Sequence, residues 1–451
     1  MSIDLVTKYN IPAPRYTSYP TVPYWDDNVS DESWIKHIKE AFKRYNEDGI
    51  SIYIHLPYCE SLCTYCACNT RITVNHNVEK PYLEALLKEW QLYLAQFEAR
   101  PKIKEIHLGG GTPTFFSPHN LNHLISSILN TCDLHEQHDL SFEGHPSNTT
   151  TAHLQTLYDL GFRRVSFGVQ DFDDKVQHTI NRYQTFEEVS NVVNAARTIG
   201  YTSVNVDLVY GLPYQTVESV KETVKKIIEL KPERIAFYSY AHVPWLKPGQ
   251  RKYTEKDLPV DSEKRKLYDT GKNLFIEAAY MDIGMDHFSL PGDDLLNAYN
   301  NGTLHRNFMG YTTNNTKLLI GLGCSSISDT WTAFSQNIKT VEEYRQMVDA
   351  GKFPLQKGHI LTEGDLNIRR HILNLMCKHQ SDFSKSSSDQ KILNENTPRL
   401  TELINDGLII VNDQKVILTE LGKLFIRNIC LAFDERYWSK AKKDNMFSTT
   451  A

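Results

Sequence analysis

The chain of 451 residues is long enough for two or three ordinary domains and for a large buried core. Its formal net charge of −6 provides no basic field, so we expect no nucleic-acid partner. The first residues, MSIDLVTKYN, lack the features of a signal peptide, and no uncharged run approaches the ~20 residues of a bilayer span, so we expect a cytoplasmic protein without a membrane partner.

Residues 1–50 precede the first predicted strand. They contain the stretch PAPRYTSYPTVPYW, whose prolines and aromatic residues disfavour a regular helix. We expect an ordered arm that lies over the following domain. A disordered tail is the alternative interpretation.

Residues 51–245 alternate between β-rich runs and amphipathic stretches long enough for helices. The runs are SIYIHL, EIHLGGG, DLSFEG, RRVSFGV, TSVNVDLVYG and RIAFYSY. Strands that alternate with helices pair in parallel, so these six β/α units predict either a partly closed barrel or a doubly wound sheet. In both architectures ligands bind at the carboxyl ends of the strands.

Residues 246–360 have a less regular pattern and form the predicted extension of the barrel. Their Asn- and Gly-rich segment, NAYNNGTLHRNFMGYTTNNT, predicts a long loop that either caps a site or lies on the surface. Residues 361–451 read as helices, a Ser-rich break, the hairpin GLIIVNDQKVILT and a last helix. This order predicts a small winged-helix-like domain, and the mixed charges of its last helices favour a lid or packing role over DNA binding.

The stretch YCESLCTYCACNT follows the first strand and contains Cys59, Cys63, Cys66 and Cys68. Zinc and an iron–sulfur cluster are both possible ligands of such thiols. The gaps of three and two residues between the first three cysteines suit three corners of a cubane cluster, which leaves one iron open. Cys68 is either a buried small residue or a thiol close to a substrate. The remaining cysteines are scattered singly, unlike a disulfide framework: Cys132, Cys324, Cys377 and Cys430.

Further candidate residues follow the later strands. The glycine run of HLGGGTPT lets the backbone approach a ligand closely, although a tight turn is the simpler interpretation. Glu143, Gln170 and Asp207 lie within or just after their strands and can hold polar ligand groups. An unpaired buried Asp207 would be costly, which favours a polar partner. Arg182 is either a solvated charge or a clamp for a carboxylate.

The Cys-x3-Cys-x2-Cys pattern, with Tyr65 before its third cysteine, resembles the signature of the radical S-adenosylmethionine (SAM) superfamily. The stretches KYNIPAPRYTSYPT, YIHLPYCESLCTYCACN, GGGTPT, GVQDF, INRYQ, DLVYGLP, YAHVP, GMDHF, LHRNFMGYTT and RNICLAFD together resemble the oxygen-independent coproporphyrinogen III oxidases. The resemblance covers nearly the whole chain. It implies an α/β fold: a partial (β/α)6 TIM-like barrel with an N-terminal arm and a mostly helical, winged-helix-like C-terminal domain.

The resemblance implies a reaction and its cofactors. The family converts two propionates of coproporphyrinogen III to vinyl groups, which gives protoporphyrinogen IX in haem biosynthesis through a 5′-deoxyadenosyl radical. It implies a 4Fe-4S cluster held by Cys59, Cys63 and Cys66 and two SAM molecules. It also implies a monomer that receives electrons from a low-potential donor such as a flavodoxin or ferredoxin.

The resemblance also implies roles for single residues. Positions expected around the first SAM are Tyr53, Gly110, Glu143, Ala241 and Ile327. Positions expected around the second are Tyr65, Gly111, Thr112, Gln170, Arg182 and Asp207. The candidate catalytic residues are Tyr53, Cys68, Glu143 and Arg182. The substrate has four carboxylates on an apolar macrocycle, so its site needs cations, and the candidates are Arg15, His287 and Arg306.

Two departures and two alternatives accompany the resemblance. His145 stands where the family more often has an acidic residue, and GCSSIS replaces a more apolar version around Cys324. There are two alternative functions. One is a haem chaperone, and the other is a haem-directed radical SAM methyltransferase or degrading enzyme. Cys68 and the arm motif PRYTSYPT favour the oxidase over the chaperone.

Overall fold

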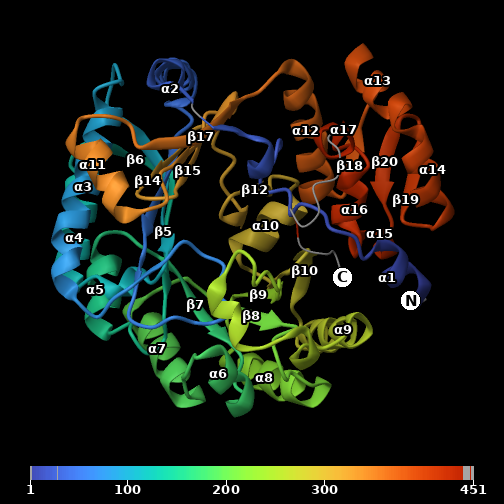
Figure 1. The fold of residues 1–451 in the computed structure, drawn as a ribbon, viewed down its shortest axis with the longest axis horizontal. Helices are drawn as coiled ribbons and strands as arrows, with labels where there is room; N and C mark the ends of the chain where they lie inside the picture. The colour runs from blue at the N-terminus through green and yellow to red at the C-terminus, as the bar shows by residue number, and fades with distance from the viewer. Residues whose placement is uncertain (1–2, 28, 440–446, 448–451) are drawn as a thin grey trace.

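The computed structural model describes residues 3–27, 29–439 and 447, and its centre is a thirteen-stranded mixed sheet (Figure 1). Seven neighbouring strands of this sheet run parallel. They are, in spatial order, β14 (Leu319–Leu322), β2 (Ile50–Leu56), β5 (Lys102–Gly110), β6 (Asp133–Gly144), β7 (Arg164–Gln170), β8 (Ser203–Tyr210) and β9 (Arg234–Ser239). The six predicted strands are therefore confirmed, and β14 adds a seventh from a distant part of the chain.

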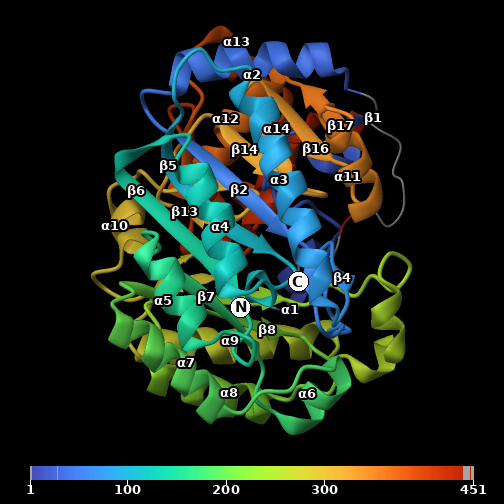
Figure 2. The ribbon, with the colours of Figure 1, turned by 90° about the vertical axis from the view of Figure 1, so that its left-hand side faces the viewer.

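The order of the strands decides between the two predicted architectures. From β2 to β9 each parallel strand pairs with the next one in the chain, without the reversal of a doubly wound sheet. Right-handed crossovers then place all the connecting helices on one face. Figures 1 and 2 show these helices along the outside of the curved sheet. The main ones are α3 (Glu79–Leu94), α4 (Pro118–Leu129), α5 (Thr151–Asp159), α6 (Asp174–Ile180), α7 (Phe186–Ile199), α8 (Val217–Leu230) and α9 (Asp261–Glu277).

Antiparallel strands extend both ends of the parallel block and leave the barrel open. One end carries β15 (Ile327–Asp329), β16 (Ala333–Asn337), β17 (Leu355–Ile360) and β1 (Asp26–Asp27). The other end carries β11 (His287–Ser289) and β10 (Met281–Gly284). The strand order ends at β1 and β10, which do not pair with each other. The result is the partial barrel that the resemblance implied.

Local signals in the sequence explain where helices begin and end. At α7, the Thr185 hydroxyl accepts a hydrogen bond from the Glu188 backbone N–H, and the Glu188 carboxylate accepts one from the Thr185 N–H. This capping box satisfies two donors that would otherwise lack partners. The helix ends at Gly200, whose φ of 119° is a conformation that favours glycine.

The N-terminal segment contains two helices around an extended stretch. Helix α1 (Ile3–Tyr9) and the extended stretch pack on the C-terminal domain, where Tyr16 and Tyr19 are 2% exposed. The arm is therefore ordered as expected, but this part of it packs on the C-terminal domain rather than over the domain that follows it in the chain. Helix α2 (Asp31–Tyr45) was not predicted, although its apolar face buries Trp34 and other residues against the barrel.

The prediction of a long loop in residues 297–316 is wrong. This segment contains the end of α10 (Asp294–Asn300) and the hairpin of β12 (His305–Asn307) and β13 (Gly310–Thr312). Its asparagines and glycines lie at the helix end and the turns rather than in one continuous loop. Residues of β12 and β13 are largely buried, because the hairpin lies between the barrel and the C-terminal domain.

The C-terminal domain has the predicted order of helices and a hairpin. It consists of α12 (Glu363–Lys378), β18 (Gln380–Asp382), α13 (Ser387–Glu395), α14 (Thr397–Asn405), β19 (Ile409–Asn412), β20 (Lys415–Leu418), α15 (Glu420–Lys423), α16 (Ile426–Leu431) and α17 (Glu435–Ser439). Its three strands form a separate small sheet beside the barrel (Figure 1). Among the described residues, no helix is long and apolar enough to cross a membrane.

Candidate active site

A cavity of about 600 Å³ opens at the carboxyl ends of the parallel strands. Its wall includes most of the residues that the sequence singled out. From the cysteine loop they are Cys59, Cys63, Tyr65, Cys66 and Cys68. From the strand ends and the segments that follow they are Gly110, Gly111, Thr112, Glu143, Gln170, Arg182 and Asp207. The parallel register thus collects residues that are up to 148 positions apart, from Cys59 to Asp207, around one space.

The cysteine loop is held against the end of β5. The Arg71 N–H donates to the Pro57 carbonyl oxygen at 2.8 Å, and the Thr112 N–H donates to the Tyr58 carbonyl oxygen at 3.0 Å. A Cβ on Gly111 would come within 2.6 Å of the Pro57 oxygen, so a side chain here would push the two segments apart. The glycine run therefore has a packing reason as well as a position on the cavity wall.

The four thiols of the loop differ in environment. Cys59, Cys63 and Cys66 are partly buried, whereas Cys68 is exposed. A hydrogen bond from the Cys68 thiol lowers the pKa of Cys66 to about 6, and burial raises the pKa of Cys59 to about 11. The interpretation of Cys68 as a buried small residue is therefore wrong. An exposed thiol on the cavity wall agrees with the other interpretation.

The donor set fits a cluster better than a mononuclear ion. Within the described ranges, 3–27, 29–439 and 447, no group of three His, Cys, Asp or Glu side chains is placed to hold a metal ion. A 4Fe-4S cluster needs a wider set, because each thiolate binds a different iron. Three partly buried thiols on one loop, beside a large cavity, meet that requirement.

Arg182 lies inside the wall of the cavity and is 8% exposed. Its Nη1 contacts the Cys63 sulfur at 3.5 Å, its Nη2 donates to the Gly168 carbonyl oxygen, and its Nε has no partner. Burial acts to lower the pKa of the guanidinium, but Tyr65 and Cys63 outweigh it, and the pKa lies above its usual value. The interpretation as a solvated surface charge is therefore wrong, and a buried cation with a free donor can bind an anion.

Glu143 belongs to a chain of polar contacts on the inner face of the strands. Its carboxylate lies 3.3 Å from the His107 Nε2, and the His107 Nδ1 lies 2.8 Å from the Ser141 hydroxyl. The Tyr53 ring stacks on the His107 ring with a centroid distance of 6.0 Å. The Glu143 side chain remains 44% exposed, so it can accept hydrogen bonds from a ligand. Tyr53 lies behind it and is not part of the cavity wall.

Asp207 has protein partners, so its carboxylate does not require a ligand to satisfy it. It accepts hydrogen bonds from the Ser166 hydroxyl at 3.0 Å and from the Asn205 amide at 2.8 Å. Burial, with a further contribution from Glu143, raises its pKa to about 6. The Asp207 carboxyl group lines the cavity, and near pH 6 it is partly protonated.

Besides Tyr53, two predicted ligand positions lie outside the cavity wall. Ala241 follows β9, and its carbonyl oxygen accepts a hydrogen bond from the Gln250 amide at 3.2 Å. Ile327 begins β15 and packs in the apolar cluster that contains Trp25 and Phe334. The same Gln250 amide donates to the Tyr65 carbonyl oxygen at 3.0 Å, so the backbone of Ala241 lies beside the cysteine loop, whereas Ile327 is not brought to the loop.

His145, the departure next to Glu143, lines the cavity as a neutral side chain. Burial, followed by the repulsion of Arg182, lowers its pKa to about 3. Its Nδ1 accepts a hydrogen bond from the Ser147 N–H at 3.2 Å. His145 therefore carries no charge at neutral pH, whereas an acidic residue at this position would be negatively charged.

Two site residues were missed in the sequence. His55 is buried on β2, and its Nε2 lies 2.9 Å from the Asn69 carbonyl oxygen, so it supports the end of the cysteine loop. Tyr238, near the end of β9, lines the main cavity and a smaller one of about 110 Å³ beneath it. A polar residue at the carboxyl end of a buried parallel strand was the available signal in both cases.

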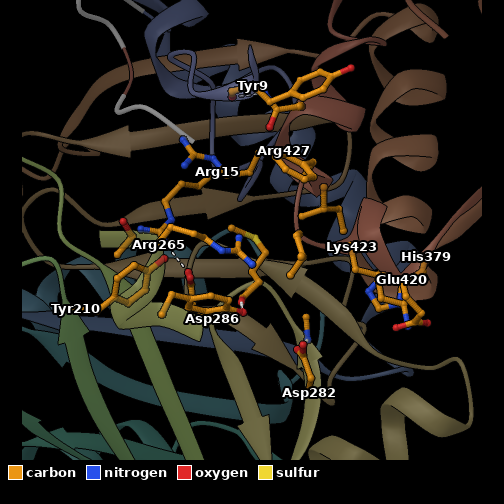
Figure 3. Close-up of a pocket in the computed structure, with 18 of the residues that line it drawn as sticks. Tyr9, Arg15, Tyr210, Arg265, Asp282, Asp286, His379, Glu420, Lys423 and Arg427 are labelled. Carbon is orange, nitrogen blue, oxygen red and sulfur yellow. Dashed lines mark hydrogen bonds and ion pairs between the residues drawn. The ribbon is translucent and has the colours of Figure 1, made fainter. Parts of the chain in front are cut away.

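The three candidate carboxylate-binding residues gather behind Tyr238. Arg15, from the arm, pairs with Asp286 and lies 5.7 Å from the Tyr238 ring centroid. It also lines a third cavity of about 320 Å³ between the barrel, the arm and the C-terminal domain (Figure 3). The His287 Nε2 lies 3.5 Å from the Tyr238 hydroxyl.

Arg306 lies next to this group and is 5% exposed. One of its nitrogens donates to the Arg15 carbonyl oxygen at 3.4 Å, whereas its Nε and Nη1 have no hydrogen-bond partner. The Nδ1 of His287 is likewise without a partner, but burial, followed by the repulsion of Arg306, lowers the pKa of His287 to about 3, so the expectation of a cation at His287 is wrong. These buried donors can bind the carboxylates of a ligand that reaches them.

Comparison with known proteins agrees with this geometry. Residues 53–227 match the Radical SAM superfamily. The oxygen-independent coproporphyrinogen III oxidase of Pseudomonas aeruginosa is 37% identical over 439 residues, which cover 96% of this chain and 95% of that protein. The corresponding Escherichia coli (strain K12) protein is 36% identical over 98% of this chain and 96% of its own length. A solved structure described as coproporphyrinogen III oxidase (HemN) from Escherichia coli, a radical SAM enzyme, superposes with a TM-score of 0.89 over 96% of this chain and 99% of that one, at 35% identity.

Proposed function

Because this chain belongs to the oxygen-independent coproporphyrinogen III oxidases, we propose that it oxidatively decarboxylates two propionates of coproporphyrinogen III to vinyl groups. The product is protoporphyrinogen IX, and molecular oxygen is not required. The observation that carries the proposal is the single cavity that joins the cysteine loop to the polar ends of the parallel strands.

The superfamily implies a 4Fe-4S cluster and SAM. When bound, they supply a 5′-deoxyadenosyl radical that removes a hydrogen atom from the propionate. Cys59, Cys63 and Cys66 are our candidates to hold the cluster, since their thiols share the loop at the cavity. Gly111 and Thr112 keep that loop in place, and Thr112 also contacts the Cys59 sulfur at 3.3 Å.

We propose that the cavity accepts two SAM molecules. Its volume of about 600 Å³ falls in the ~300–1,000 Å³ range of small-molecule sites. The positively charged Arg182 suits the carboxylate of one SAM, while Tyr65, Gly111, Thr112, Gln170 and Asp207 surround the same space. Gly110 and Glu143 suit the other SAM, with Tyr53 behind Glu143. Ala241 and Ile327 lie outside this wall, so their assignment to the first SAM has no support from the cavity.

The chain's own residues have distinct roles in this proposal. Arg182 binds and orients a carboxylate with its free Nε. Glu143 accepts hydrogen bonds from a ligand and is positioned by His107. The exposed thiol of Cys68 lies on the cavity wall, where it can hold or donate a proton or hydrogen atom near the substrate.

The substrate carboxylates require cations and hydrogen-bond donors. Arg306 is a cation with unpartnered donors, Arg15 lies on the Tyr238 ring beside it, and the neutral His287 has an unpartnered Nδ1. Each charged hydrogen bond to a carboxylate contributes about 1.5–3 kcal/mol. We assign the propionates that do not react to these residues, with the macrocycle against Tyr238.

The remaining partners follow from the same family membership. We propose a cytoplasmic monomer that receives electrons from a flavodoxin or ferredoxin. The cluster must be reduced before each cleavage of SAM, so a low-potential donor is a requirement of the chemistry.

The experiment that tests the function is an anaerobic assay. The reconstituted protein is mixed with dithionite, SAM and coproporphyrinogen III, and the products are separated by chromatography. Protoporphyrinogen and deoxyadenosine together support the oxidase. Deoxyadenosine without protoporphyrinogen favours a haem-directed radical enzyme, and neither product favours a haem chaperone, which a haem titration then tests.

A further inference from the structure

Large apolar side chains are exposed around the cysteine loop. Leu62 and Ile72 are 41% and 40% exposed and border the main cavity, and the neighbouring Val74 is 76% exposed. Trp245 and Leu246, from the segment after β9, are 50% and 64% exposed. Exposed apolar residues that gather in one place mark binding surfaces, whereas single ones need no explanation.

The two segments that carry these residues are joined. Gln250 is fully buried, and its amide donates to the carbonyl oxygens of Tyr65 and Ala241 at 3.0 and 3.2 Å. The Lys247 ammonium donates to the Cys68 carbonyl oxygen at 3.0 Å. Figure 2 shows β4 (Arg71–Ile72) of the cysteine loop beside the segment after β9, on one side of the molecule. The segment that carries Trp245 and Leu246 therefore lies against the loop that carries Leu62, Ile72 and Val74.

Cations without carboxylate partners surround the same place. In the part of the chain that the structure describes, Lys247, Arg251, Lys252 and Lys339 form no ion pair. Lys339 lies beside the cysteine loop, and the charges of Lys357 and Lys247 add to the effect of burial in lowering its pKa. Its carbonyl oxygen also accepts a hydrogen bond from Asn69, next to Cys68.

Of the carboxylates near the loop, Glu342 pairs with Arg71 at 3.0 Å, whereas Glu60 accepts a hydrogen bond from the neutral Asn148 amide at 2.8 Å and keeps its charge. The segment after β9 also carries Glu255. Four cations that form no ion pair with a described residue still give this surface an excess of positive charge, although the whole chain has a net charge of −6. We call this surface the donor patch: Leu62, Ile72, Val74, Trp245 and Leu246, with Lys247, Arg251, Lys252 and Lys339.

We propose that the donor patch is the docking surface for a small acidic one-electron carrier protein of the flavodoxin type. The inference rests on the proposed function, which requires a reduced cluster. One electron leaves the reduced carrier, which is oxidised, and enters the cluster, which is reduced. Complementary charges accelerate and orient such encounters, and a small apolar centre suits a weak, transient interface.

Two variants and a control test the patch. Lys252→Glu/Lys339→Glu reverses two exposed charges, and Trp245→Ser removes an exposed apolar side chain. Lys385→Glu/Lys391→Glu, on exposed residues in and before α13 of the C-terminal domain, makes the same charge change elsewhere. The reconstituted proteins are titrated with oxidised flavodoxin by calorimetry at low ionic strength. Their turnover is then measured with reduced flavodoxin and with dithionite.

The charge-reversal variant is expected to raise the Kd for flavodoxin at least about tenfold, because two repulsive contacts replace two attractive ones. Trp245→Ser is expected to raise it about threefold or more, and the control to leave it unchanged. Rates with dithionite should stay within about twofold of wild type, since the small reductant does not need the patch.

An unchanged Kd in both patch variants overturns the proposal. An equal loss of turnover with dithionite and with flavodoxin also overturns it. A change confined to the KM for coproporphyrinogen overturns it as well, because the patch would then be an entrance for substrate. A wild-type protein that forms no protoporphyrinogen with dithionite refutes the proposed function instead, and the binding titration then still reports separately on the patch.

Discussion

Arg182 provides the sharpest test of the cavity, because it is a buried cation whose Nε lacks a partner. Arg182→Met keeps an unbranched side chain of similar length but removes the charge and all donors. If Arg182 binds the carboxylate of SAM, the variant loses charged hydrogen bonds worth about 1.5–3 kcal/mol. Since 1.36 kcal/mol corresponds to a factor of ten, the KM for SAM should rise about 10- to 150-fold.

The assay measures deoxyadenosine formation against SAM concentration in anaerobically reconstituted protein. Iron content should stay at the wild-type level, because Arg182 only contacts the Cys63 sulfur and is not a thiol ligand. Arg182→Lys should fall between wild type and Arg182→Met, since lysine keeps the charge but cannot bind a carboxylate in a bidentate manner. A wild-type KM for SAM in Arg182→Met would refute the assignment, and a loss of iron would show a structural role for Arg182 in the loop.

Further predictions concern the cluster, the substrate and the fold. Serine at any of the three predicted cluster cysteines should abolish iron binding, whereas Cys68→Ser should retain iron and lose turnover; unchanged iron counts in the first three would contradict the assignment. Arg306→Met should raise the KM for coproporphyrinogen about tenfold or more with little effect on the KM for SAM, and equal effects on both would count against it. Burial raises the pKa of Glu89 to about 7 from 4.5, so its stabilising contribution is present below pH 4.5 and is lost as the pH rises through 7. Denaturant unfolding should therefore show a free-energy advantage of wild type over Glu89→Gln that decreases by about 3 kcal/mol between pH 4.5 and 8, and parallel pH profiles would refute this reasoning.

The local sequence pattern predicted the six consecutive parallel strands of the barrel, but it did not predict the strands that the rest of the chain adds. The six parallel strands were predicted because each is a short β-rich run between helical stretches, and neighbours in the chain are also neighbours in the sheet. Strand β14 pairs with β2 across 268 positions of sequence, as in the pairs of Gly321 with Tyr53 and of Leu322 with Ile54. No local signal identifies such a partner. The hairpin of β12 and β13 was missed for a similar reason, because its asparagines and glycines suggested a loop while its burial depends on the C-terminal domain.

The sequence by itself determined which chemical groups are available at the site. It placed four thiols in one loop after a strand, glycines after the next strand, and polar residues at the ends of later strands. Parallel pairing of consecutive β/α units then requires these strand ends to meet at one edge. The assignment of individual residues to the cluster and to two SAM molecules stays a prediction.

Only the tertiary structure decided the environment of each group. It made Arg182 buried beside Cys63, Cys68 exposed and His145 neutral, and it brought Arg15 from the arm onto the Tyr238 ring. The physical reason is that hydrogen bonding, burial and pKa depend on neighbours from distant parts of the chain. Residue type and local spacing determine which groups are available, whereas the packing of the arm, the barrel and the C-terminal domain determines what surrounds them.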